Sequence, residues 1–214
     1  MKPMLSSLLL AGALLLPGAS ASAALLPGSP APNFTLTDTT GHEVTLEAFR
    51  GKVVVLEWTN PNCPFVRKQY TSKKMQDLQK KYTAQGVIWL QVNSSAPGED
   101  GDFTPAETNR ISTERGAAPT AILPDRAGTV GHLYDAKSTP HMFIISKTGN
   151  VVYNGAIDSI KSNKPADVPL AQNYVALALD ELLAGKDVTI SAAVPYGCFV
   201  HYSKAKPAAP VPQS

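Results

Sequence analysis

The chain has 214 residues, of which 43% are hydrophobic and 17% are charged, and its formal net charge is +2. This length suits one domain with a sizeable core. A near-neutral chain gives no electrostatic reason to expect nucleic acid or an anionic membrane as a partner.

The first 23 residues are typical of a signal peptide. Lys2 supplies a positive start, residues 5–16 form an apolar core, and Ala21-Ser22-Ala23 offers small residues for cleavage after Ala23. The apolar run is too short for a permanent anchor, so we expect no membrane span in the mature chain. We therefore expect an exported protein, periplasmic in a Gram-negative host and secreted otherwise.

The next segment favours a small β-hairpin followed by a buried strand. Residues 34–37 alternate in polarity, residues 38–41 favour a turn, and residues 42–45 complete the hairpin. Residues 46–49 have the length of one helical turn. Residues 52–58 are rich in β-branched residues and mostly apolar, which predicts the first long buried strand.

The most informative feature is the loop between this strand and a helix predicted over residues 64–84. Cys63 comes directly before Pro64, and proline suits the first helical position because its missing N–H has no helical partner there. This order places a thiol at the positive end of a helix, where free backbone N–H groups and the helix dipole favour thiolate. Thiolate attacks disulfides and peroxides, so the loop indicates thiol redox chemistry.

Helices and strands alternate along the rest of the chain. In the helix after Cys63 we expect Val66 and Tyr70 to face the core and Lys68 to lie on a solvated side. Further strands are predicted over residues 87–92, 121–123, 142–145 and 151–153, and further helices over 104–116, 129–134 and 170–184. The pattern predicts an α/β fold, with a mixed central β-sheet flanked by helices and an N-terminal β-hairpin extension.

The sequence contains only two cysteines, Cys63 and Cys198. An exported chain meets an oxidising compartment, so an even count favours a disulfide between them. One interpretation is a structural bridge that closes a long loop. The other is a redox pair in which Cys198 resolves the oxidised form of Cys63. Residues 24–203 then form one domain, and residues 204–214 lack apolar bulk, which predicts a disordered tail.

Several of these segments resemble the thioredoxin-like superfamily, and in particular its redoxin branch, the alkyl hydroperoxide reductase/thiol-specific antioxidant-like proteins. Asn62-Cys63-Pro64 matches the position of the redox centre, and Thr139-Pro140 resembles the Thr–cis-Pro element that faces it. Gly197-Cys198 resembles a segment near the end of a single-Cys redoxin subgroup whose centre reads Asn-x-Cys-Pro. The resemblance covers residues 30–185 and implies a thioredoxin-like fold.

The resemblance also implies roles for individual residues. Glu57 matches the buried acid that accepts a proton in thioredoxins, the alternative being a solvent-facing residue at a strand end. A cis bond before Pro140 would bring the backbone of Thr139 beside Cys63, where a substrate peptide pairs next to Pro64; the alternative is an edge turn. No metal or organic cofactor is implied.

The sequence departs from the family pattern at three positions. Thioredoxins carry Cys-x-x-Cys, but Val66 stands at the second position here. Peroxiredoxins carry Thr or Ser three residues before the reactive Cys and Pro seven before it, whereas this chain has Asn60 and Leu56. The hydroxyl that would orient a peroxide is therefore missing.

Taken together, these observations predict an exported thiol-disulfide oxidoreductase of the redoxin type. Cys63 would be the nucleophile, Cys198 the resolving residue, and Glu57 and Pro140 further catalytic residues, with Thr139 and Pro64 binding substrate. The partners would be a protein thiol or disulfide and an external thiol electron donor. Two alternatives stay open: a thiol peroxidase acting on a small peroxide, and a non-enzymatic binding protein in which Cys63–Cys198 is a permanent brace.

Overall fold

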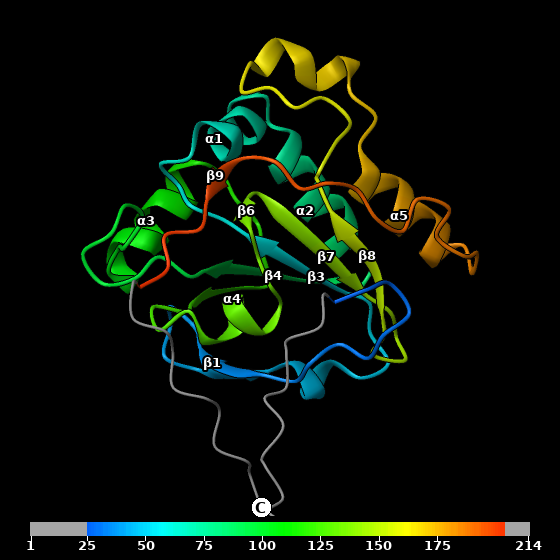
Figure 1. Cartoon of the computed structure of the whole chain (residues 1–214), viewed down its shortest axis with the longest axis horizontal. Coiled ribbons are helices and arrows are strands. Elements are labelled where there is room, and N and C mark those ends of the chain that lie inside the picture. The colour runs from blue at the N-terminus through cyan, green and yellow to red at the C-terminus, as the bar shows by residue number, and fades with distance from the viewer. Residues whose placement is uncertain (1–24, 204–214) are drawn as a thin grey trace, which may run out of the picture.

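The computed structural model describes residues 25–203, so the predicted signal peptide and tail lie outside the described residues. Its centre is a five-stranded mixed sheet in the order β5-β4-β3-β7-β8 (Figure 1). β3, β4 and β5 run parallel, while β7 and β8 are antiparallel to their neighbours. The strands are β3 (Val54–Trp58), β4 (Ile88–Asn93), β5 (Ala121–Pro124), β7 (His141–Ile145) and β8 (Val151–Gly155).

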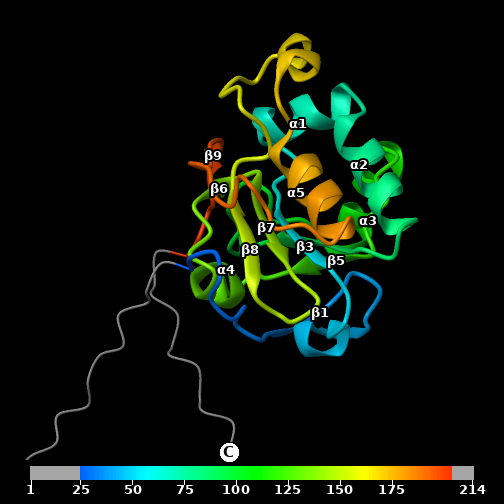
Figure 2. The same cartoon turned by 90° about the vertical axis from the view of Figure 1, so that its right-hand side faces the viewer.

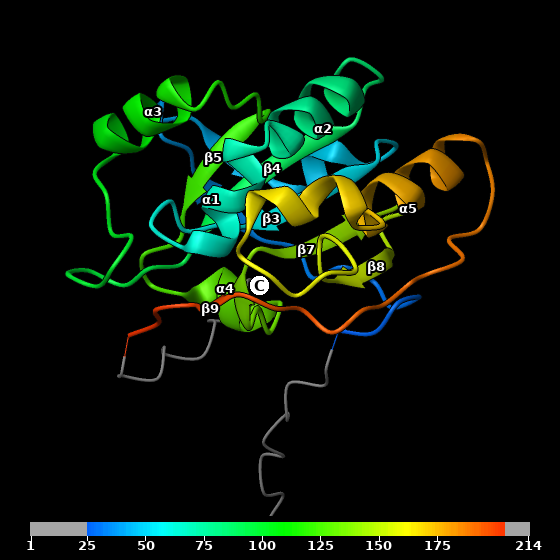
Figure 3. The same ribbon diagram turned by 90° about the horizontal axis from the view of Figure 1, so that it is seen from above.

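Helices cover both faces of this sheet, which confirms the predicted fold class (Figures 1 and 3). One face carries α1 (Pro64–Thr71), α2 (Lys74–Thr83) and α5 (Tyr174–Leu183). The other carries α4 (Thr129–Leu133) and the predicted N-terminal hairpin of β1 (Thr35–Thr37) and β2 (Glu43–Thr45), followed by the 3-10 turn η1 (Leu46–Phe49). The remaining helical elements are α3 (Pro105–Glu114) and the 3-10 helix η2 (Pro165–Leu170).

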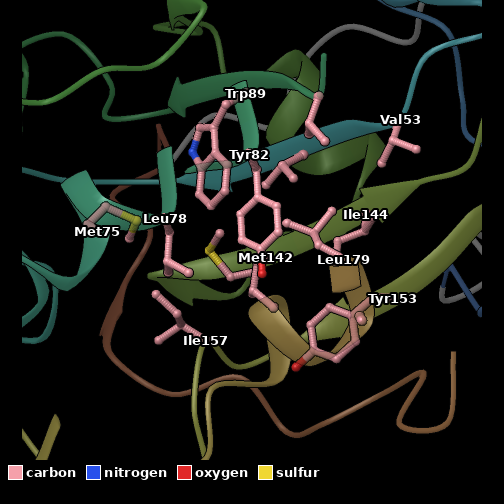
Figure 4. Packing of buried hydrophobic residues seen from close by; sticks show 14 of the residues in the cluster. Val53, Met75, Leu78, Tyr82, Trp89, Met142, Ile144, Tyr153, Ile157 and Leu179 are labelled. Atoms are coloured by element: carbon pink, nitrogen blue, oxygen red, sulfur yellow. The ribbon is translucent and has the colours of Figure 1, made fainter. Parts of the chain in front are cut away.

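Alternating side chains of β3 divide the core into two layers. Val55 belongs to the layer under α1, α2 and α5, whereas Leu56 and Trp58 belong to the layer over α4. Figure 4 shows the first layer, where side chains from the sheet meet those of α2 and α5. Glu57 shares the face of Val55, so its carboxyl group points into the layer that also contains Cys63.

The helix predicted over residues 64–84 is two helices in the structure. Lys73 adopts a left-handed backbone conformation with φ of 61°, which ends the hydrogen-bond ladder between α1 and α2. The side chain of Gln76 donates to the carbonyl of Tyr70 at 3.0 Å and satisfies a group freed by the break. The sequence has no Gly or Pro at this position, so the break was not predicted.

A C-terminal strap, residues 186–203, crosses one end of the sheet after α5 (Figures 2 and 3). Its backbone first runs beside β8, where the N–H of Asn154 donates to the carbonyl of Ser191 at 3.0 Å. It then forms β9 (Cys198–Phe199), which pairs antiparallel with β6 (Ser138–Thr139). Neither of these short strands was predicted, although they join the C-terminal strap to the segment just before β7.

No helix within residues 25–203 has the length and apolar character needed to cross a membrane.

Candidate redox site

Cys63 occupies the N-cap of α1, with Pro64 as the first helical residue. The buried strand β3 leads into the loop before it, and the N–H of Cys63 donates to the carbonyl of Asn60 at 3.1 Å. The Cys63 side chain is only 2% exposed. Its sulfur therefore lies at the start of the helix, as the sequence predicted, but under cover rather than open to solvent.

The loop that carries Cys63 is held by Asp100, which lies in the loop between β4 and α3. The side chain of Asn62 donates to the Asp100 carboxylate at 2.5 Å, and that of Asn60 donates to the Asp100 carbonyl at 3.1 Å. A side chain at Gly101 would collide with Asn60, since its Cβ would lie 2.6 Å from the amide group. These contacts could not be predicted from local sequence patterns, because the two segments are almost forty residues apart.

The Thr139–Pro140 peptide bond is cis, as expected from the resemblance. It lies directly against the reactive loop: the Cys63 thiol donates to the Thr139 carbonyl at 3.0 Å. This contact joins two segments that are far apart in sequence, and it defines one wall of the site.

Cys198 approaches the same segment from the C-terminal strap. In the β6–β9 pair, Thr139 and Cys198 are directly opposite each other. Both cysteines are free thiols, and the Cys198 thiol donates a hydrogen bond to Cys63. Burial is the largest cause that raises the pKa of Cys198 to about 12, and the hydrogen bond and charge of Cys63 and the charge of Asp100 contribute to the same rise. Cys198 therefore keeps its proton at neutral pH.

Glu57 is fully buried in the sheet, so the solvent-facing alternative is wrong. Its carboxylate accepts hydrogen bonds from four side chains: Trp89 at 2.8 Å, Gln91 and Gln79 at 3.1 Å each, and Tyr70 at 3.5 Å. Burial raises the pKa of Glu57 to about 7, and the four donors limit that rise.

Glu57 has an indirect connection to solvent. Tyr70 and Gln91, which both contact its carboxylate, also line a small cavity under α3 together with Arg115. Within residues 25–203, no direct hydrogen bond joins Glu57 to Cys63. A proton could therefore pass between Glu57 and Cys63 only through an intermediary.

Lys68 is the largest correction to the sequence analysis. The prediction of a solvated lysine is wrong: its side chain is fully buried and its Nζ lies 3.4 Å from the Asp158 carboxylate. Nζ also donates to the Tyr196 hydroxyl at 3.2 Å and to the Ile160 carbonyl at 3.3 Å. Its charge is therefore compensated by Asp158 and is not directed at the Cys63 sulfur.

His141, which follows the cis proline, is also buried. Lys137 N–H donates to its Nδ1 at 3.2 Å, so the ring proton lies on Nε2 and is donated to Asn154 at 2.7 Å. Burial lowers the pKa of His141 to about 4. The ring packs 4.5 Å from that of Phe143, in the layer away from Cys63, so His141 is a neutral structural residue.

Comparisons with known proteins identify relatives of this chain. A family model described as the AhpC/TSA family matches residues 27–154. The thiol-disulfide oxidoreductase ResA of Geobacillus kaustophilus (strain HTA426) is 33% identical over 123 residues, which cover 56% of this chain and 63% of that protein. The chain thus spans less than two thirds of the length of this curated relative.

Two solved structures show the same fold. An uncharacterized conserved protein from Geobacillus kaustophilus aligns with a TM-score of 0.74 and 26% identity, over 85% of this chain and 95% of that one. The thioredoxin domain of a thiol-disulfide oxidoreductase from Bacteroides vulgatus aligns with a TM-score of 0.50 and 19% identity, over 69% of this chain and 98% of that one. The fold is thus thioredoxin-like.

Proposed function

The chain belongs to the AhpC/TSA family, and on this basis we propose that it is an exported thiol-disulfide oxidoreductase with Cys63 as nucleophile and Cys198 as resolving residue. One observation carries the proposal: β6 places Cys198 opposite Thr139, whose carbonyl lies 3.0 Å from the Cys63 sulfur. The two thiols are therefore already neighbours. The relative named a thiol-disulfide oxidoreductase supports the same reaction class.

In the first step, the Cys63 thiolate attacks one sulfur of a disulfide in a partner protein. A new bond forms between Cys63 and that sulfur, the partner's S–S bond breaks, and the second partner sulfur leaves as a thiolate that takes up a proton. Thr139 and Pro140 supply the backbone edge that faces the Cys63 sulfur, and Pro64 begins the helix whose positive end carries Cys63.

In the second step, Cys198 loses its proton and attacks the Cys63 sulfur. The Cys63–Cys198 bond forms, the partner's remaining sulfur leaves as a thiol, and the partner has gained two electrons and two protons overall. Two causes of the raised pKa of Cys198, the hydrogen bond and the charge of Cys63, vanish once Cys63 is bonded to the partner. Cys198 thus becomes easier to ionise at the stage where it must react.

We assign Glu57 as the proton acceptor for this stage. Its pKa of about 7 suits a group that takes and releases a proton near neutrality. Tyr70 and Gln91 contact its carboxylate and reach the cavity under α3, which offers a route for exchange with solvent. An external thiol electron donor then reduces the Cys63–Cys198 bond and restores both thiols.

The test follows reduction of a disulfide-containing protein by the full chain with an external thiol, using wild type, Cys63→Ser and Cys198→Ser. We expect Cys63→Ser to abolish turnover and Cys198→Ser to accumulate a mixed disulfide on Cys63, visible by mass spectrometry. Wild-type turnover in Cys63→Ser would refute the assignment of the nucleophile. A Cys63–Cys198 bond that resists the donor would instead indicate a permanent brace.

A parallel assay of hydrogen peroxide consumption distinguishes the thiol peroxidase alternative. Asn60 stands where a hydroxyl would orient a peroxide, and its amide is committed to Asp100 and to the N–H of Asn62. We therefore expect disulfide reduction to be much faster than peroxide consumption. Cleavage after Ala23 in secreted material, found by N-terminal sequencing, tests export.

A further inference from the structure

A buried ion pair lies between the segments that carry the two cysteines, and the exchange reaction does not use it. Lys68 follows Cys63 by five residues in α1, and its partner Asp158 follows β8. The carboxylate of Asp158 also accepts from the Gln69 amide at 2.7 Å and from the Ile160 N–H at 3.1 Å. An apolar pair would stabilise a core at least as well, so stability alone does not account for this pair.

Tyr196 connects this pair to the C-terminal strap. It lies two residues before Cys198, is 6% exposed, and donates its hydroxyl proton to Asp158. Lys68 Nζ lies 5.4 Å from the centre of the Tyr196 ring, and the Phe65 ring meets it edge-on at 5.8 Å. Two residues of α1 therefore hold Tyr196 in place: Lys68 contacts its hydroxyl and its ring, and Phe65 packs against its ring.

Gly197 then brings the strap against the cis-proline segment. Its φ of 147° suits glycine, and a Cβ there would lie 2.0 Å from the Thr139 carbonyl oxygen. The same oxygen accepts the hydrogen bond from the Cys63 thiol. The strap thus occupies the backbone edge of β6, and Cys63 is left 2% exposed.

We propose that Tyr196 is a positioning residue, which uses Asp158 and Lys68 to hold Cys198 against β6 beside Cys63. The inference rests on the proposed function, because it assigns Tyr196 to the resolving step. It also means that the strap covers Cys63, so a partner protein reaches this sulfur only after the strap has moved. Closing the Cys63–Cys198 bond requires the strap to return to the same place.

The first experiment measures alkylation of Cys63 by iodoacetamide in a Cys198→Ser background, where only one thiol can react. Tyr196→Phe keeps the ring and removes the hydroxyl bond to Asp158, so the strap should open more often. We expect alkylation about tenfold faster, the factor typical for losing a hydrogen bond to a buried charge. Tyr134→Phe is the matched control, since it removes a hydroxyl bond to Pro32 in the other core layer.

A second variant acts without disturbing the ion pair. Gly197→Ala pushes the strap away from Thr139 through the close contact of the new Cβ, and it should also accelerate Cys63 alkylation. A third measurement uses the chain with both cysteines and follows the equilibrium of the Cys63–Cys198 bond with glutathione. We expect Tyr196→Phe to shift it toward the dithiol, because open straps cannot form the bond.

These results separate the two proposals. If Cys63 alkylation in Tyr196→Phe stays within threefold of its parent, or rises equally in Tyr134→Phe, the positioning role is wrong even when the wild type reduces disulfides. If alkylation rises as expected but the wild type shows no turnover, Tyr196 still holds the strap, and it is the proposed oxidoreductase function that fails.

Discussion

The stability of this protein should change little between pH 7 and pH 5, because two buried groups titrate there with opposite effects. Glu57 and His141 lie in different core layers, and neither exposes more than 3% of its surface. Burial penalises the charged form of each, which raises the pKa of the acid and lowers that of the base.

For Glu57, the pKa of about 7 in the native state compares with 4.5 for an ordinary glutamate. Between these values the native protein holds a proton that the unfolded chain has lost. The stability from this group is complete below pH 4.5 and is lost as the pH rises through 7. From pH 5 to pH 7 the loss amounts to about 2 kcal/mol.

For His141, the pKa of about 4 compares with 6.5 for an ordinary histidine. Between these two pH values the unfolded chain binds a proton that the native protein does not bind. The stability is complete above pH 6.5 and is lost as the pH falls toward 4. From pH 7 to pH 5 this loss is again about 2 kcal/mol, opposite in sign to the change from Glu57.

Substitution of one of the two groups should reveal the pH-dependent stability that the other group contributes. On going from pH 7 to pH 5, Glu57→Gln should lose about 2 kcal/mol of unfolding free energy, and His141→Gln should gain about 2 kcal/mol. Urea unfolding of the reduced protein at both pH values, followed by tryptophan fluorescence, measures each change. Each variant is compared with itself at the two pH values, so any pH-independent loss of unfolding free energy caused by the substitution cancels. Parallel pH profiles for wild type and both variants would refute the reasoning.

Two further predictions concern the site. Lys68→Met should destabilise the protein by about 3 kcal/mol or more, since it leaves the Asp158 carboxylate buried without its cation. Lys81→Met, at a half-exposed surface pair, is the control and should cost under about 1 kcal/mol. Equal losses of unfolding free energy in urea would contradict this prediction. Cys63→Ser should lower the pKa of Cys198 below 12, because the charge of Cys63 is removed while desolvation remains. An unshifted pH profile of Cys198 alkylation would count against this prediction.

Local signals in the sequence identified the loop that carries Cys63, but not the C-terminal strap that covers it. Pro64 after a buried strand and the Thr139-Pro140 pair are short motifs with a direct structural meaning, and both lie where they were expected. Lys68 was misplaced because a charged residue on a helix is normally solvated, and its partner Asp158 is distant in sequence. The sequence suggested that the two cysteines pair, but not that a strand would carry the second one to β6.

The position of the strap has a consequence for biosynthesis. A ribosome makes the reactive loop early and the strap much later, after the sheet and its helices. Until the strap has been made and has paired with β6, the Cys63 sulfur has no cover and can react with any disulfide that it meets. A product that ends before residue 186 would therefore carry an uncovered Cys63 thiol.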